Sequence, residues 1–173
     1  MKNKKIVLCG LFCAIGVLLP QLFHGFGPAA GQIFLPMHIP VLMAGLLLGP
    51  WAGVVTGVVS PVLSCMITGM PAPARLPFMV LELAAYGIVS GLFSKKQMTL
   101  KRAYVGLISS QAAGRAVNAL CTVVAVYLLG VKGASVQAVW GSVVTGLPGI
   151  AIQLILIPPL VLAVGKYTIG KPM

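Results

Sequence analysis

LPFMVLELAAYGIVSGLF, residues Leu76–Phe93, is an almost unbroken apolar run that contains the single acidic residue of the chain, Glu82. A helix needs about 20 such residues, with a range of roughly 17–25, to cross the hydrocarbon core of a bilayer. An ionisable group at the centre of such a helix costs a few kcal/mol on insertion scales, so its presence requires a structural or functional reason. The run therefore predicts a transmembrane helix in which Glu82 has a specific role.

The rest of the chain has the same character. Of its 173 residues, 59% are hydrophobic and only 8% are charged, and the mean hydropathy is +1.07. A soluble domain carries about 25% charged residues because its surface faces water. Lipid must therefore be the solvent for most of this chain, which predicts an all-α integral membrane protein with one transmembrane domain over residues 1–173.

Breaks rich in Gly and Pro divide the chain into apolar spans. We expect about six transmembrane helices, at Lys5–Phe23, Pro36–Leu48, Trp51–Thr68, Leu76–Phe93, Ala103–Leu129 and Val136–Val164. The first run is too long for the apolar region of a signal peptide, so we expect it to remain as a helix. The second is short, and the last is long enough to tilt in the bilayer.

Basic residues predict the orientation of these spans. The net charge is +11, but the Lys and Arg residues sit between apolar runs and are typical of topology signals rather than of nucleic-acid binding. With six spans, one side of the membrane receives nine of them (Lys2, Lys4, Lys5, Lys95, Lys96, Lys101, Arg102, Lys166 and Lys171), and the other only Arg75 and Lys132. We expect both termini to be cytoplasmic, in a bacterial plasma membrane.

Catalytic and cofactor motifs are missing from the sequence. It contains no GxxxxGK[ST] phosphate loop, HExxH or GxSxG, and no Asp. The four cysteines lie in apolar stretches without the spacing of a zinc site. A hydrolytic triad or metal-assisted chemistry is poorly supported, so we predict no cofactor, no metal and no enzymatic activity. A transport or binding role fits better.

Polar residues form stripes at helical spacing on three spans. They are Glu82 and Tyr86 on the fourth span, Gln111, Arg115 and Asn118 on the fifth, and Ser142, Thr145 and Gln153 on the sixth. Three stripes on adjacent helices predict one polar cleft. Two interpretations of Glu82 and Arg115 are compatible: an ion pair that holds two helices together, or a site in which Arg115 binds a ligand carboxylate while Glu82 tunes it.

Six other candidates lie near the predicted outer surface or in the apolar runs. Trp140 is either an interfacial anchor or a surface for an aromatic ligand. His24 and Met70 lie in the outer breaks His24–Phe34 and Gly69–Arg75, which are either a lid or plain connectors. We interpret His38 as a structural residue. On the first span, Gly10 and Ala14 form a small-xxx-small pair for close helix contact, either within the chain or with another membrane subunit.

Local strings give the whole pattern a family resemblance. They are Phe34-Leu35-Pro36-Met37-His38-Ile39-Pro40, Gly45-Leu46-Leu47-Leu48-Gly49-Pro50, Ser60-Pro61-Val62-Leu63-Ser64, Thr68-Gly69-Met70-Pro71 and Glu82-Leu83-Ala84-Ala85-Tyr86-Gly87. The chain resembles the substrate-binding S component of energy-coupling factor (ECF) vitamin transporters over nearly its whole length.

The resemblance implies a function that depends on partners. An S component captures a vitamin-like micronutrient from outside and works with a transmembrane T component and two ABC ATPases. It also implies a pocket in the outer halves of the fourth to sixth helices, which places Glu82, Tyr86, Arg115 and Asn118 in it, and docking through the first helix, where Gly10 and Ala14 are the nearest match. The alternatives are a standalone secondary transporter in which Glu82 carries a coupling proton, and a membrane scaffold without transport activity.

Overall fold

The computed structural model describes residues 2–25, 27, 29–95, 98–127, 130 and 136–168, and within these ranges the chain forms eight α-helices and no strand. The helices are α1 (Lys2–His24), α2 (Ala30–Phe34), α3 (His38–Leu48), α4 (Pro50–Thr68), α5 (Leu76–Leu92), α6 (Leu100–Tyr127), α7 (Val136–Thr145) and α8 (Leu147–Thr168). The all-helical prediction is confirmed.

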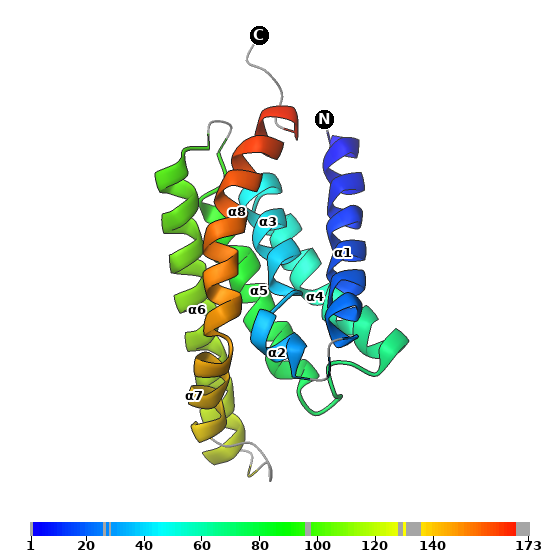
Figure 1. The fold of residues 1–173 in the computed structure, drawn as a ribbon, viewed down its shortest axis with the longest axis vertical. Coiled ribbons are helices and arrows are strands. Elements are labelled where there is room, and N and C mark those ends of the chain that lie inside the picture. The colour runs from blue at the N-terminus through cyan, green and yellow to red at the C-terminus, as the bar shows by residue number, and fades with distance from the viewer. Residues whose placement is uncertain are drawn as a thin grey trace.

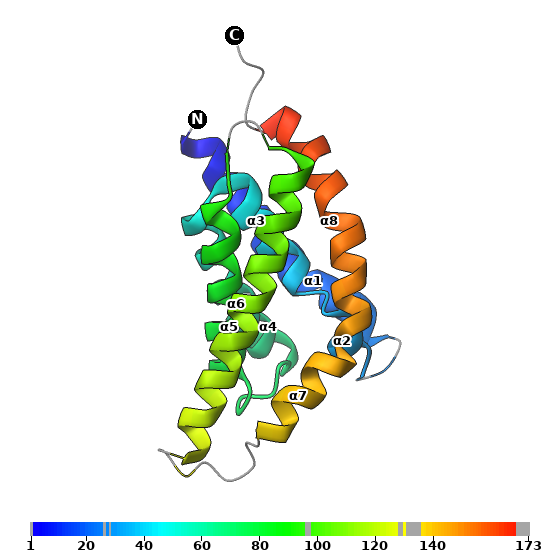
Figure 2. The ribbon, with the colours of Figure 1, turned by 90° about the vertical axis from the view of Figure 1, so that its left-hand side faces the viewer.

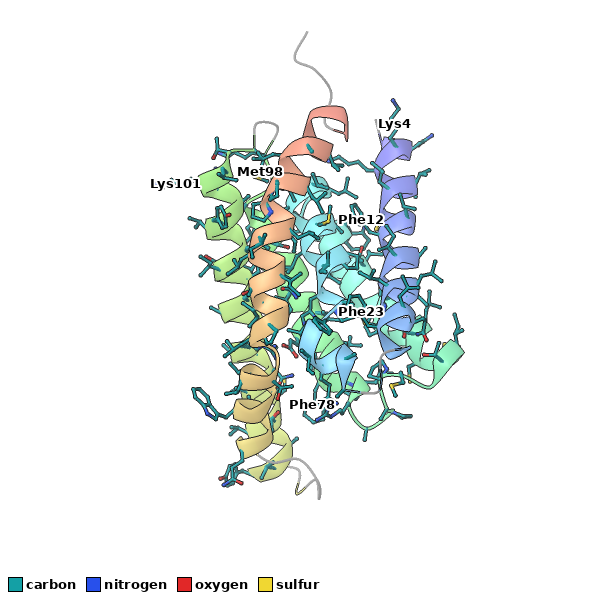
Figure 3. All side chains as sticks on the ribbon, in the orientation of Figure 1. Lys4, Phe12, Phe23, Phe78, Met98 and Lys101 are labelled. Carbon is teal, nitrogen blue, oxygen red and sulfur yellow. The ribbon has the colours of Figure 1, made fainter. Side chains whose placement is uncertain are left out.

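The long helices run up and down in one bundle (Figures 1 and 2). The helix α8 ends at the end of the bundle where α1 begins, and Lys4 and Lys101 lie at this same end (Figure 3). In the described part of the chain, four segments are long and apolar enough to cross a membrane: Asn3–Phe23, Ala30–Leu48, Pro50–Thr68 and Leu147–Gly165. The helix α5 is a shorter apolar helix of 17 residues, and α6 carries three basic residues. The count of six spans therefore stays a prediction.

The outside of the bundle is apolar. Large hydrophobic side chains with more than half of their surface exposed occur on α1, α4, α6 and α8; examples are Ile6, Leu18, Leu22, Met66, Ile67, Leu120 and Ile155. A water-soluble monomer rarely exposes contiguous apolar surface on this scale. This exterior is the one that a lipid environment requires.

Two segments are interrupted: Ala30–Leu48, which begins before the predicted second span Pro36–Leu48, and the predicted last span. Leu35, between α2 and α3, has a left-handed φ of 50°; it precedes Pro36, which disfavours the right-handed helical conformation at the residue before it. The predicted last span is divided at Gly146 into α7 and α8. The chain changes direction between these two helices (Figure 2). Pro148 supplies no N–H for the carbonyl of Val144, which explains an interruption here. Both interruptions lie beside the polar residues described below.

The centre of the bundle is α3, and beside it α4 and α5 pack on each other through glycines. Leu42 and Leu46 of α3 are fully buried. A methyl group placed on Gly57 of α4 would lie 2.6 Å from the Leu83 carbonyl oxygen of α5, and one on Gly87 of α5 would collide with the backbone of Gly53. Such close backbone approach is a main source of helix association in lipid. From α1, Phe12 reaches into this core (Figure 3).

Candidate functional site

Glu82 lies on α5 six residues after Leu76, roughly 9 Å along the helix from its first residue, and is 5% exposed. Its Oε1 accepts a hydrogen bond from the Tyr86 hydroxyl at 3.2 Å and lies 3.2 Å from Nη1 of Arg115. Its Oε2 accepts a hydrogen bond from Nδ2 of Asn118 at 2.7 Å. The carboxylate is thus held by three donors of the protein. We call these four residues, together with His38, the Glu82 cluster.

Helical spacing explains how α5 and α6 present these groups to each other. Glu82 and Tyr86 are four residues apart on α5, and Arg115 and Asn118 are three apart on α6, so each pair shares one helix face. Gly114 lets the Tyr86 ring lie against α6, because a methyl group there would come within 2.8 Å of the ring atom Cε2. The predicted Glu82–Arg115 ion pair is confirmed.

His38 completes the cluster from a third helix. It is the first residue of α3 and is 5% exposed. Its Nε2 is 3.9 Å from Oε1 of Glu82, and its ring lies edge-on to Tyr86 with centroids 5.1 Å apart. Neither ring nitrogen has a hydrogen-bond partner among the described residues. Sequence reasoning had assigned His38 no ligand role, because no periodic pattern connects the start of α3 to a face of α5.

Arg115 uses only part of its guanidinium within the protein. Nη1 pairs with Glu82, whereas Nε and Nη2 are buried and have no hydrogen-bond partner in the described part of the chain. The side chain is 15% exposed. Nη2 faces the junction of α7 and α8, where a methyl group on Gly146 would lie 3.0 Å from it. The cluster therefore contains charged donors that the described protein leaves unused.

A chain of amides lies one helical turn from Arg115. Nε2 of Gln111 donates to Oε1 of Gln153 at 3.0 Å, and Nε2 of Gln153 donates to the carbonyl of Leu35 at 3.4 Å. We call this arrangement the glutamine bridge. It ties α6 and α8 to the interruption between α2 and α3, and Gln153 is only 1% exposed. The predicted site residue Gln111 thus contacts α8.

The other predicted site residues whose side chains the structure describes make no hydrogen bond or ion pair with the cluster. Trp140, on α7, is 72% exposed, and Met70, in the segment between α4 and α5, is 40% exposed. In the predicted polar stripe of the last span, the Ser142 hydroxyl donates to the Val139 carbonyl of its own helix, and Thr145 is exposed. The side chain of His24 lies outside the described residues. Of this stripe, Gln153 is the member that bonds to α6.

Gly10 and Ala14 lie on an exposed face of α1. A methyl group on Gly10 would meet no described atom within 4 Å, whereas Gly16 packs against the side chain of Ser60 on α4. The contact between α1 and the rest of the bundle therefore uses a different face, and the Gly10–Ala14 pair is left uncovered by the described chain.

Comparison with protein families gives the context for this geometry. The sequence model described as "ECF transporter, substrate-specific component" matches residues 4–161. The chain belongs to this family. The match extends from α1 into α8 and includes all five residues of the Glu82 cluster. No curated protein and no solved structure matches the chain significantly.

Membership confirms the resemblance seen in the local strings. The protein is a substrate-specific membrane component of an ECF transporter, and such a component is a substrate-binding subunit rather than an enzyme itself. The family implies association with a T component and ATPases in a membrane.

Proposed function

We propose that this protein is the S subunit that captures a small water-soluble vitamin or related micronutrient from outside and delivers it through an ATP-driven partner complex. The main support for a binding site comes from Arg115. Glu82 pairs with its Nη1, whereas its Nε and Nη2 have no hydrogen-bond partner among the described residues. A buried donor without an acceptor costs about 1–3 kcal/mol, and more when it is charged. A ligand with matching acceptors removes that cost, which supports a binding role for the Glu82 cluster in addition to its role between α5 and α6.

The distribution of charge supports an orientation with six spans and both termini in the cytoplasm. Among the described basic side chains, Lys4 and Lys101 mark one end of the bundle (Figure 3), and Arg75 lies in the segment that follows α4 at the other end. The positive-inside rule then assigns the lysine-bearing end to the cytoplasm of a multi-pass bacterial plasma membrane protein. Glu82, near the start of α5, falls in the outward half.

The uncovered pair Gly10 and Ala14 supports α1 as the contact with a T component that carries two ABC ATPases. Small residues spaced four apart allow two helices to approach closely in lipid, where packing rather than the hydrophobic effect drives association. A Trp side chain at either position would hold the two helices apart.

A second function, a standalone proton-coupled transporter, is favoured by the 3.9 Å between His38 and Glu82. Two titratable groups so close inside a membrane are a known arrangement in proton relays. Uptake into liposomes separates the two functions. We expect the chain alone to give no concentrative uptake of its ligand, and uptake to require the T component, the ATPases and ATP. Uptake by the chain alone, driven by a proton gradient, would replace the proposed function with this second one.

A further inference from the structure

We propose that the ligand of the Glu82 cluster carries a single carboxylate, which binds to the Nε–Nη2 edge of Arg115. This inference rests on the proposed function, in that it assumes a ligand at this cluster, and it adds the chemical class of that ligand.

The geometry of the guanidinium gives the first argument. Glu82 engages Nη1, so the two donors left without a described partner are Nε and Nη2. These are neighbouring atoms on one edge of the guanidinium, and their N–H groups form the parallel fork that matches the two oxygens of a carboxylate. A single carbonyl acceptor fills only half of this edge.

The charges of the cluster give the second argument. Glu82 already accepts from Tyr86 and Asn118 and pairs with Arg115, so little capacity is left for donors of a cationic ligand. Among the described residues, the basic side chains within 4 Å of the Glu82 carboxylate are Arg115 at 3.2 Å and His38 at 3.9 Å. The groups left available are the Nε–H and Nη2–H donors of Arg115, and they suit the two acceptor oxygens of a carboxylate rather than a cation.

The space beside Nη2 gives the third argument. A methyl group on Gly146 would lie 3.0 Å from Nη2 and 3.0 Å from Cδ1 of Leu35. Because Gly146 has no side chain, Nη2 of Arg115 can lie against the α7–α8 junction, where Cδ1 of Leu35 and the Ser142 carbonyl oxygen are also close. We infer that residue 146 determines specificity, because any larger residue would compete with a carboxylate for the fork.

The test is a ligand-depletion measurement by mass spectrometry on the purified full-length chain, with a metabolite extract to which matched pairs are added: nicotinate with nicotinamide, and pantothenate with panthenol. We expect the retained compounds to carry one carboxylate, and the acid of a retained pair to bind roughly 10- to 100-fold more tightly than its neutral partner, as expected for charge-assisted hydrogen bonds. Retention of a compound without a carboxylate would overturn this inference and leave the proposed function standing. Retention of no compound would overturn both.

Two variants test the fork itself. Arg115→Lys keeps the positive charge beside Glu82 but has no fork, so we expect the acid to bind roughly 10-fold or more weakly and the preference for acid over neutral partner to fall. Gly146→Ala should weaken binding of the acid about 10-fold. The matched control is Gly141→Ala on α7, where a methyl group meets nothing within 4 Å and no change is expected. An unchanged preference for the acid in Arg115→Lys would overturn the assignment, even if Gly146→Ala fails to fold.

Discussion

The two sides of α5 join their neighbours by opposite means. Toward α4, Gly87 and Leu83 meet Gly53 and Gly57 at backbone distance, with no side chain between the helices. Toward α6, Glu82 and Tyr86 meet Arg115 and Asn118 through an ion pair and hydrogen bonds. The glycine side depends on shape alone, which makes it a rigid support, whereas the polar side contains donors that are not used up in packing. We infer that the first side fixes the position of the second.

The largest expected effect comes from breaking the glycine side. Gly87→Leu places a side chain where a methyl group already collides with the Gly53 backbone. We expect the cost of this substitution to exceed the roughly 1–3 kcal/mol typical of overpacking, since no flexible side chain can move aside. Because the collision is with backbone rather than with a flexible side chain, we expect loss of monodisperse protein in detergent, measured by size-exclusion chromatography and melting temperature. The control is Gly141→Leu on the exposed face of α7, and a normal melting temperature for Gly87→Leu would contradict the comparison.

The next effect comes from the polar side. Glu82→Gln leaves the Arg115 charge without its partner, and removing one member of a buried ion pair typically costs about 3–5 kcal/mol. The double variant Glu82→Gln with Arg115→Met removes both charges and should recover much of this stability without recovering ligand binding. Thermal unfolding and ligand retention would be measured on the same samples. A double variant that binds ligand normally would show that the pair serves only to join the helices.

A smaller effect is expected for the glutamine bridge. Gln153→Ala removes its hydrogen bonds to Gln111 and Leu35, and each such bond contributes about 0.5–1.5 kcal/mol. We expect a modest fall in melting temperature and a few-fold loss of ligand affinity, because the bridge holds α8 against α6 beside Arg115. The exposed Gln137 on α7 provides the control Gln137→Ala, and equal effects of the two substitutions would remove any positional role for the bridge.

Substitutions on α1 are expected to have the smallest effect on stability and ligand binding. Gly10→Trp or Ala14→Trp adds a side chain to an exposed face, so the melting temperature and ligand retention should stay unchanged. Assembly with the T component, measured by co-purification, should be lost. An intact complex would refute the docking assignment of this face.

The sequence predicted those features that depend on one helix at a time. Helical spacing placed Glu82 with Tyr86 on one helix face, and Arg115 with Asn118 on another. The cost of an isolated charge in lipid predicted that Glu82 and Arg115 meet, as they do in the structure. What it missed depends on interruptions between helices. His38 reaches Glu82 from the start of α3. The break at Gly146 divides the predicted stripe, leaving Ser142 and Thr145 on α7 and Gln153 on α8. Periodicity within an assumed continuous helix carries no information on either arrangement.

The central claim is that Arg115 holds a ligand, and native mass spectrometry of the chain purified in detergent tests it most directly. Wild-type protein incubated with a metabolite extract should carry an added small-molecule mass, and Arg115→Ala should not, while both remain folded. The control is Arg102→Ala, near the start of α6, which removes a hydrogen bond from Arg102 to the Phe93 carbonyl. This variant should retain the ligand. The same bound mass on folded Arg115→Ala and on wild type would contradict the account.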